Sequence, residues 1–271
     1  VRMVSGRRDA GKSPEKADVQ EDYPAQEGRE VDGAAQKAPG QEEGNRDPSG
    51  GGSGPLTYVV RQLWQEYQAD DGAPIFSVQL SWPAFDGEGE GVKTINRYFE
   101  NWAQEKLAEY SGGQNSTRQS ALEVYRESRS TSWTGPWGET YEVESVQTHG
   151  DYVSILMASS LAEGAAGGLP YRESHLFRIS DGERVGICEI TKKEQKEWDR
   201  ILRENFSRAV REGDPALYYN NALERLQTCD MQKAGCYFSD TGIVFYLPPY
   251  EIAPYSTGYV EVLIPYDEAG A

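Results

Sequence analysis

The chain has 271 residues and carries 44 Asp and Glu against 27 Lys and Arg, a formal net charge of -17. This excess of negative charge repels phosphate groups, so it argues against nucleic acid and anionic lipid surfaces and favours a cationic partner. No stretch approaches the roughly 20 apolar residues needed to cross a bilayer, and the N-terminus lacks the apolar core of a signal peptide. Because the chain begins at Val1, we expect any membrane attachment to come only through an anchor upstream of this sequence.

Residues 1–55 differ in composition from the rest of the chain. They contain one aromatic residue, Tyr23, and no Leu, Ile, Phe or Trp, so they cannot bury enough apolar surface to offset chain entropy. They hold 8 Lys and Arg against 11 Asp and Glu, which leaves 19 against 33, a net charge of -14, for residues 56–271. The sequence therefore predicts a disordered tail or tether over 1–55 and an acidic folded part after it.

The folded part begins with a predicted β-hairpin and a long helix. Residues 56–68 and 75–82 are rich in aromatic and β-branched side chains and flank a turn at Gly72, as in a hairpin. Apolar residues then recur at helical spacing over 95–110. A weaker pattern predicts a second helix over 116–127.

The middle of the chain again has strand character. Residues 140–147, 152–160 and 171–179 predict three consecutive strands of an antiparallel meander, with a Gly/Ala-rich loop over 164–170 before the third. Residues 185–190, which include Cys188, are apolar and predict a further strand.

Two helices and two strands complete the prediction. Thr191 and Glu194 form a T-x-x-E capping box that would open a helix, and Asp214-Pro215 would open a shorter one. Strands are expected over 242–247 and 259–264. This order of elements predicts an α+β fold with antiparallel sheets and packed amphipathic helices. We divide the chain into the tail 1–55, an N-terminal half 56–165 and a C-terminal half 166–271.

The C-terminal stretch carries the most specific pattern. It contains the run Tyr250-Glu-Ile-Ala-Pro-Tyr255, followed by Gly258 and a closing Ile264-Pro-Tyr266. This pattern resembles the signature of the extracytoplasmic domain of RsiV-type anti-sigma factors, the lysozyme-responsive regulators of Gram-positive bacteria. PdaC-type peptidoglycan deacetylases share that domain in their N-terminal part. The resemblance covers roughly residues 57–267 and includes no sigma-binding segment, membrane span or deacetylase domain.

The resemblance implies an envelope protein that lies outside the cytoplasm and binds a ligand, which is lysozyme for the RsiV type. A domain of net charge -14 would also attract a cationic protein such as lysozyme by electrostatic steering. One departure is that relatives often carry a His after Gly-Gly-Ala in the middle loop, whereas residues 164–170 contain none. If that loop contacts a ligand, its contact chemistry is altered here.

The candidate binding residues are Tyr250, Glu251, Pro254 and Tyr255. Prolines stiffen this segment, and tyrosines lose little side-chain entropy when they bind a protein, so the segment suits protein recognition. The alternative is a packed corner that joins the last two strands, with the tyrosine hydroxyls tied to the backbone and Glu251 satisfying loop amides.

The three cysteines bear on location. Cys229 and Cys236 are close enough in sequence for a loop-closing disulfide in an oxidising compartment. Three reduced thiols, or a pair that includes Cys188, remain open alternatives.

The sequence shows no enzyme signature, cofactor motif or metal-binding pair. His149 and His175 lie on separate elements, and we interpret both as structural or solvated. The acidic pairs Glu142/Glu144 and Glu88/Glu90 have no second acid placed opposite them. The first hypothesis is a non-catalytic sensor or binding domain. The second is a cell-wall glycan-binding module that uses Trp133 and Trp137, and the third is a carboxylate-dependent hydrolase.

Overall fold

The computed structural model describes residues 29–31, 56–111, 115–128, 133–164 and 166–271. Most of the predicted tail therefore lies outside the described residues. The exception is the short strand β1 (Arg29–Val31), which pairs antiparallel with Gln62–Trp64 of the next strand. The tail interpretation did not predict this pairing.

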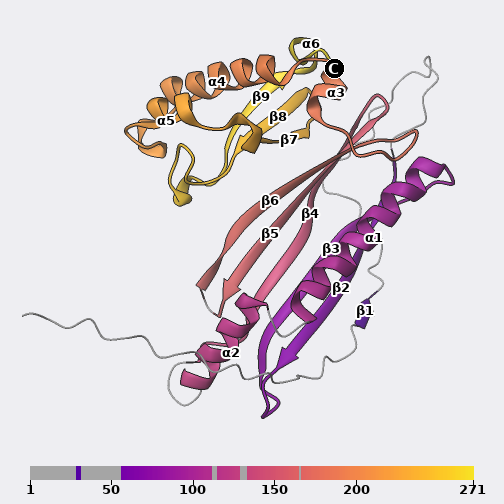
Figure 1. Cartoon of the computed structure of the whole chain (residues 1–271), viewed down its shortest axis with the longest axis vertical. Coiled ribbons are helices and arrows are strands. Elements are labelled where there is room, and N and C mark those ends of the chain that lie inside the picture. Colours follow the sequence, from indigo (N-terminus) through magenta and orange to yellow (C-terminus); the bar gives the residue numbers. More distant parts are fainter. Residues whose placement is uncertain (1–28, 32–55, 112–114, 129–132, 165) are drawn as a thin grey trace, which may run out of the picture.

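A long six-stranded sheet forms the body of the described chain (Figure 1). Its strand order follows the sequence, and every neighbouring pair is antiparallel except β3 and β4, which are parallel. After β1 come the strands β2 (Tyr58–Gln68), β3 (Pro74–Phe85), β4 (Trp137–His149), β5 (Tyr152–Glu163) and β6 (Ala166–Arg178). The predicted hairpin and the predicted meander are both confirmed.

The expected loop over 164–170 is wrong, because β6 already begins at Ala166. The β5–β6 hairpin turns tightly at Gly164, whose φ of +64° is unfavourable for other residues, and Glu163 pairs with Ala166. The strand β6 thus belongs to the large sheet although it follows residue 165. The division at 165/166 stays a prediction.

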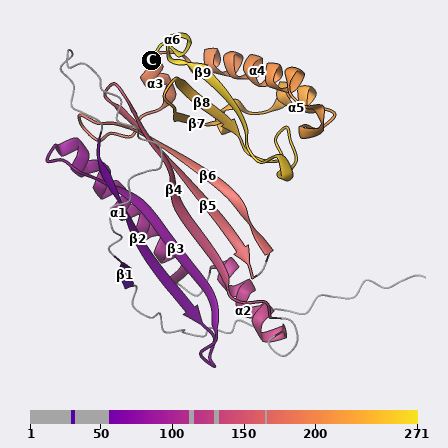
Figure 2. The ribbon, with the colours of Figure 1, turned by 180° about the vertical axis from the view of Figure 1, so that it is seen from behind.

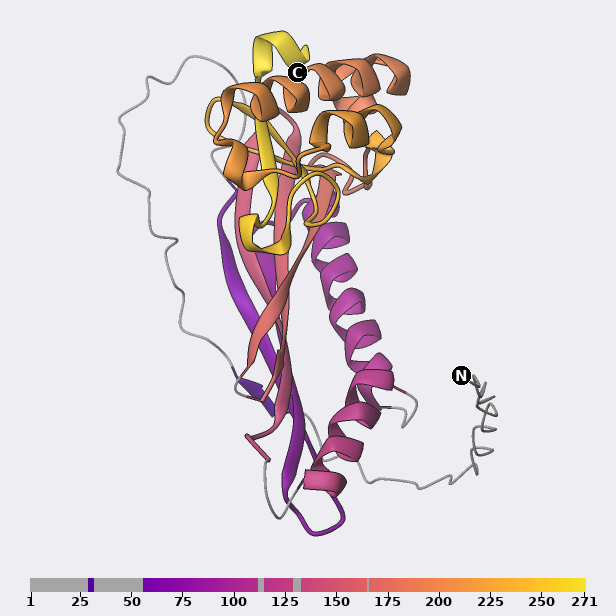
Figure 3. The same ribbon diagram turned by 90° about the vertical axis from the view of Figure 1, so that its left-hand side faces the viewer.

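The crossover between the parallel strands β3 and β4 contains two helices, α1 (Glu90–Ser111) and α2 (Ser116–Ser128). Parallel neighbours require such a crossover, and α1 lies along one face of the sheet (Figure 3). Its buried face repeats at helical spacing through Val92, Ile95, Phe99, Trp102, Ala103 and Tyr110. These side chains form the first core with residues of β2 to β6.

Two contacts hold the start of α1 against the sheet. A Cβ on Gly91 would lie 2.0 Å from the carbonyl oxygen of Ile179, so only glycine permits this approach. The Asn96 amide donates to the Phe85 carbonyl oxygen at 2.9 Å and accepts from its backbone N–H at 2.8 Å. These contacts fix the start of the helix relative to the end of β3 and to the residue that follows β6.

The second unit caps one end of the large sheet (Figure 2). A three-stranded antiparallel sheet packs against α4 and α5 around a second core that includes Trp198, Phe206, Phe245 and Ile264. The unit comprises α3 (Ile187–Thr191), α4 (Gln195–Glu212), α5 (Ala222–Thr228), β7 (Gly235–Phe238), β8 (Gly242–Leu247), β9 (Val260–Pro265) and α6 (Tyr266–Ala269), with 3₁₀ turns η1 (Pro215–Leu217), η2 (Met231–Lys233) and η3 (Tyr255–Thr257). The α+β class is confirmed.

Local predictions in this unit needed four corrections. The strand expected over 185–190 is the helix α3, and β7 was not predicted. The T-x-x-E capping box is wrong: the Thr191 hydroxyl donates to the Ile187 carbonyl oxygen at 2.8 Å and accepts from Trp198 Nε1 at 3.0 Å. Asp214 does cap, by accepting from the Ala216 N–H at 2.9 Å, but it opens η1 rather than a longer helix.

The two units meet along β5 and β6. Ser154 accepts from the Phe238 N–H at 3.1 Å, and the hydroxyls of Ser174 and Tyr246 lie 2.7 Å apart. Arg172 forms ion pairs with Glu144 of β4 and with Glu261 of β9. Polar contacts therefore tie the small sheet to the large one beside the second core.

Candidate functional site

The predicted recognition loop connects β8 to β9. Its centre is a packed corner, because Ile252 and Ala253 are fully buried in the second core. The Ile252 carbonyl oxygen accepts from the Tyr219 N–H at 3.1 Å, which joins the loop to the segment after η1. The corner interpretation is therefore correct for the middle of the loop.

Tyr250, at the start of the loop, points out of this corner. Its side chain is 57% exposed, and its φ of +72° lies in the left-handed region that bulky residues rarely adopt. Such strain persists only where the surroundings hold the backbone. Here the Tyr250 N–H donates to the Ala253 carbonyl oxygen at 2.9 Å, and Arg225 of α5 donates to the Tyr250 and Glu251 carbonyl oxygens. Arg225 was not singled out from the sequence, although it fixes the aromatic side chain that the loop presents.

Glu251 is tied to the body of the unit. Its carboxylate lies 3.1 Å from Lys233 Nζ and accepts from the Cys229 thiol at 3.5 Å. Burial, and then the Glu251 charge, raise the pKa of the Cys229 thiol to about 11. Glu251 thus anchors the loop, and the charge it offers to a ligand is partly neutralised by Lys233.

The end of the loop supports the exposed tyrosine. Tyr255, half-buried at the start of η3, stacks on Tyr250 with ring centroids 6.3 Å apart and an interplanar angle of 21°. Pro254 is also half-buried and precedes η3 directly. The four candidate residues lie in one loop, and the structure divides them into one exposed residue, Tyr250, and three half-buried ones that support it.

An exposed apolar side chain belongs to a segment that is bonded to the same loop. Leu217 is 45% exposed, and its carbonyl oxygen accepts from Thr257 Oγ1 at 2.7 Å. An aromatic ring on a fixed backbone, with an exposed leucine in the segment bonded to the same loop, can bury apolar surface against a partner protein.

The cysteines are unbridged in the structure. Cys236 is buried in β7, and burial, followed by the neighbouring Cys188, raises the pKa of its thiol to about 12. Cys229 instead faces Glu251. The Cys229–Cys236 disulfide expected for an exported protein stays a prediction.

The remaining candidates lie apart from one another and in different surroundings. His149 stacks on Tyr266 with ring centroids 3.7 Å apart, whereas His175 is fully buried under α1. Trp133 and Trp137 are partly buried and pack against the first core, so only part of each ring is open to a ligand. Glu144 pairs with Arg172, and Glu88 and Glu90 both pair with Lys93.

The described residues contain neither a cluster of metal ligands nor a helix that could span a membrane. No three His, Cys, Asp or Glu side chains there converge so that they could hold a metal ion. No helix in the same part of the chain has both the length and the apolar character that a membrane span requires.

The architecture defines a two-unit α+β protein in which a small C-terminal unit presents a rigid tyrosine-bearing loop. Residues 186–267 of that unit match the family DUF3298, described as a protein of unknown function. The fold is similar to the crystal structure of a DUF3298 family member from Bacteroides fragilis, with 15% identity and a TM-score of 0.52 over 78% of this chain and 91% of that chain. A DUF3298 family protein from Pseudomonas aeruginosa gives 15% identity and a TM-score of 0.47 over 79% and 91%. No curated protein matches the sequence.

Proposed function

We propose that the chain is a non-catalytic, extracytoplasmic sensor or binding domain whose Tyr250–Tyr255 loop binds a cationic protein such as lysozyme. The observation that carries the proposal is Tyr250, an exposed aromatic side chain on a strained backbone that Arg225 holds in place. The sequence resemblance to the RsiV-type domain supports the choice of lysozyme and the location outside the cytoplasm.

The physical case rests on rigidity and charge. A loop whose backbone is already fixed loses little conformational entropy on binding, so more of the contact energy contributes to affinity. Its exposed ring can bury apolar surface with few rotamers to restrict. The net charge of -14 on residues 56–271 would draw a cationic protein toward this surface and speed its association.

The experiment measures binding of hen lysozyme to the immobilised full chain by biolayer interferometry. Tyr250→Ala should weaken binding by about 1 kcal/mol or more, the scale of an interface anchor, while the thermal unfolding midpoint changes little. Tyr171→Ala is the matched control, because Tyr171 is also exposed, at 73%, but lies on β6 of the large sheet. It should bind lysozyme like the unaltered protein.

Charge steering gives a second measurement on the same surface. The association rate should fall as salt is added, because salt screens the attraction between the acidic domain and the basic protein. The absence of any lysozyme binding would refute this ligand. Equal losses for Tyr250→Ala and Tyr171→Ala would refute the loop as the binding surface.

A further inference from the structure

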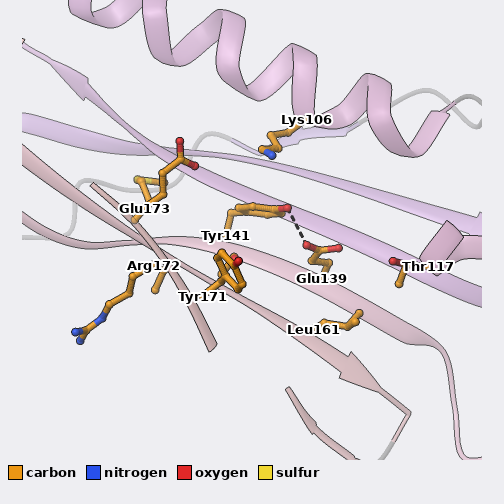
Figure 4. Close-up of a pocket in the computed structure, with 11 residues that line it drawn as sticks. Lys106, Thr117, Glu139, Tyr141, Leu161, Tyr171, Arg172 and Glu173 are labelled. Carbon is orange, nitrogen blue, oxygen red and sulfur yellow. Dashed lines mark hydrogen bonds between the residues drawn. The ribbon is translucent and has the colours of Figure 1, made fainter. Parts of the chain in front are cut away.

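A separate hollow of about 450 Å³ lies between the large sheet and the ends of α1 and α2 (Figure 4). We name this hollow the Tyr171 pocket. Six of the side chains that line it determine its chemistry: Lys106, Glu139, Tyr141, Ser159, Tyr171 and Glu173. Its volume falls within the range of about 300 to 1,000 Å³ typical of small-molecule sites.

The register of the sheet brings the floor of this pocket together. Tyr141 of β4 pairs with Ser159 of β5, and Ser159 pairs with Tyr171 of β6, so these three side chains form one row across the sheet. Met157 pairs with Glu173 in the next row. Because alternate residues of a strand point to opposite faces, Tyr171 and Glu173 face the pocket together.

The pocket lies on the opposite face of the sheet from the C-terminal unit. Arg172, between Tyr171 and Glu173, directs its guanidinium away from the pocket, where it pairs with Glu261 of β9 (Figure 4). A ligand in the Tyr171 pocket would therefore contact a different surface from the Tyr250 loop.

Hydrogen bonds orient the polar groups of the pocket. The Tyr141 hydroxyl donates to the Glu139 carboxylate at 2.8 Å and lies 3.0 Å from the Tyr110 hydroxyl. Burial raises the pKa of both tyrosines, so both hydroxyls stay protonated at neutral pH. Lys106 extends from α1 over the Tyr141 ring, with its Nζ 5.6 Å from the ring centroid.

This set of groups selects among ligand classes. An apolar molecule would strip water from two carboxylates without replacing their hydrogen bonds. An anion would meet Glu139 and Glu173, whereas the two lining cations already have partners: Lys106 pairs with Glu109, and Arg172 pairs with Glu144 and Glu261. A saccharide fits better, since its hydroxyls can donate to the carboxylates and accept from Lys106 and Ser159, and its C–H face can cover an aromatic ring.

We propose that the Tyr171 pocket binds a neutral saccharide, with the exposed Tyr171 ring as the stacking surface and Glu139 and Glu173 as acceptors for sugar hydroxyls. Tyr171 is 73% exposed, the largest exposed fraction among the large apolar side chains of the described residues. This site is independent of the proposed lysozyme surface and assigns the glycan contact to residues other than Trp133 and Trp137.

The test titrates the full chain, labelled with ¹⁵N, with cellotriose, maltotriose and chitotriose, and follows backbone amide shifts. At least one trisaccharide should bind with a Kd of millimolar or below and shift amides of β4 to β6 near residues 139–141, 157–161 and 171–173. Tyr171→Ala should weaken that binding about fivefold or more, because the stacking surface is lost. Glu139→Gln and Glu173→Gln test the acceptors separately and should each weaken it.

Tyr250→Ala is the matched control and should bind the trisaccharide like the unaltered chain. No shift with any trisaccharide at 20 mM would overturn the proposal, as would affinities unchanged by Tyr171→Ala. Binding of arginine amide without any trisaccharide would also overturn it and would assign the carboxylates to a cationic ligand. Tyr250→Ala should weaken the binding of lysozyme only, and Tyr171→Ala should weaken the binding of the trisaccharide only. The two proposals can therefore fail separately.

Discussion

Replacing His175 with Asn should reduce the decrease in the free energy of unfolding that occurs as the pH falls. His175 is fully buried in β6, where its Nδ1 lies 3.1 Å from the Tyr98 hydroxyl and its ring packs against Phe99. Burial, and then the positive charge of Arg184, lower the pKa of His175 from 6.5 to about 3. The half-exposed Glu173 carboxylate comes only within 3.5 Å of Nε2, and burial outweighs its attraction for a proton.

The sign and size follow from proton binding. The unfolded chain protonates this histidine below pH 6.5, whereas the folded protein keeps it neutral down to about pH 3. Because the unfolded state binds more protons between pH 6.5 and pH 3, the free energy of unfolding falls as the pH falls through this window. The stability associated with a neutral His175 is fully present above pH 6.5. Between pH 7.5 and pH 5.5 the ratio of protonation factors of the unfolded chain is 11/1.1, so the loss is RT ln 10, about 1.4 kcal/mol.

Urea unfolding at pH 7.5 and 5.5, followed by tryptophan fluorescence, measures this contribution. The unaltered protein should lose about 1.4 kcal/mol more than His175→Asn between the two pH values. Tyr98→Phe is the control: it removes the hydroxyl beside Nδ1 but keeps a buried imidazole, so it should keep the full pH dependence even if its stability is lower. An equal loss for the unaltered protein and His175→Asn would refute the reasoning.

Three further predictions concern the fold. Gly91→Ala should destabilise the protein by about 2 kcal/mol or more in thermal or urea unfolding, because the new Cβ would collide with the Ile179 carbonyl oxygen. This loss is expected although Ala is the better helix former. Gly89→Ala is the control and should change stability little, since no atom lies within 4 Å of its added Cβ. Arg172→Ala should cost about 2 kcal/mol and increase amide exchange between the units, because it removes both of its ion pairs; unchanged exchange in β7 and β9 would contradict this. Trp198→Phe should lower the free energy of unfolding in urea by about 2 kcal/mol, because the smaller ring leaves a void and removes the hydrogen bond from Nε1 to the Thr191 hydroxyl. A loss under about 0.5 kcal/mol would count against this prediction.

Local pattern was enough to predict the elements whose own sequence decides them. The α1 helix shows its buried face as a 3.6-residue repeat, and the β2–β3 hairpin has alternating side chains around a turn glycine. Thr191 shows where such reasoning fails. Its sequence context is a capping box, but Trp198 Nε1 donates to its hydroxyl from the next helix. A tertiary contact replaced the local one, and no local pattern contains that information.

The candidate site was predictable only where its own local sequence determines its structure. Prolines and tyrosines identified a stiff, aromatic loop, and the structure brings those residues together. Which ring faces outward depends on the positive φ of Tyr250 and on Arg225, 25 residues earlier. The Tyr171 pocket was missed because its row of side chains depends on the register of three strands. Sequence alone left that register open at the β5–β6 turn.

The strand β6 explains how one chain can present two unrelated surfaces. His175 and Phe177 enter the first core, while Leu176 enters the second, so a slip of one residue would exchange two sets of buried side chains. Arg172 and Ser174 add polar contacts to β9 and β8 on the second side. This double constraint keeps Tyr171 and Glu173 on the pocket face, because no neighbouring register would satisfy both cores. The geometry of the pocket is therefore fixed by the same contacts that attach the unit carrying the Tyr250 loop.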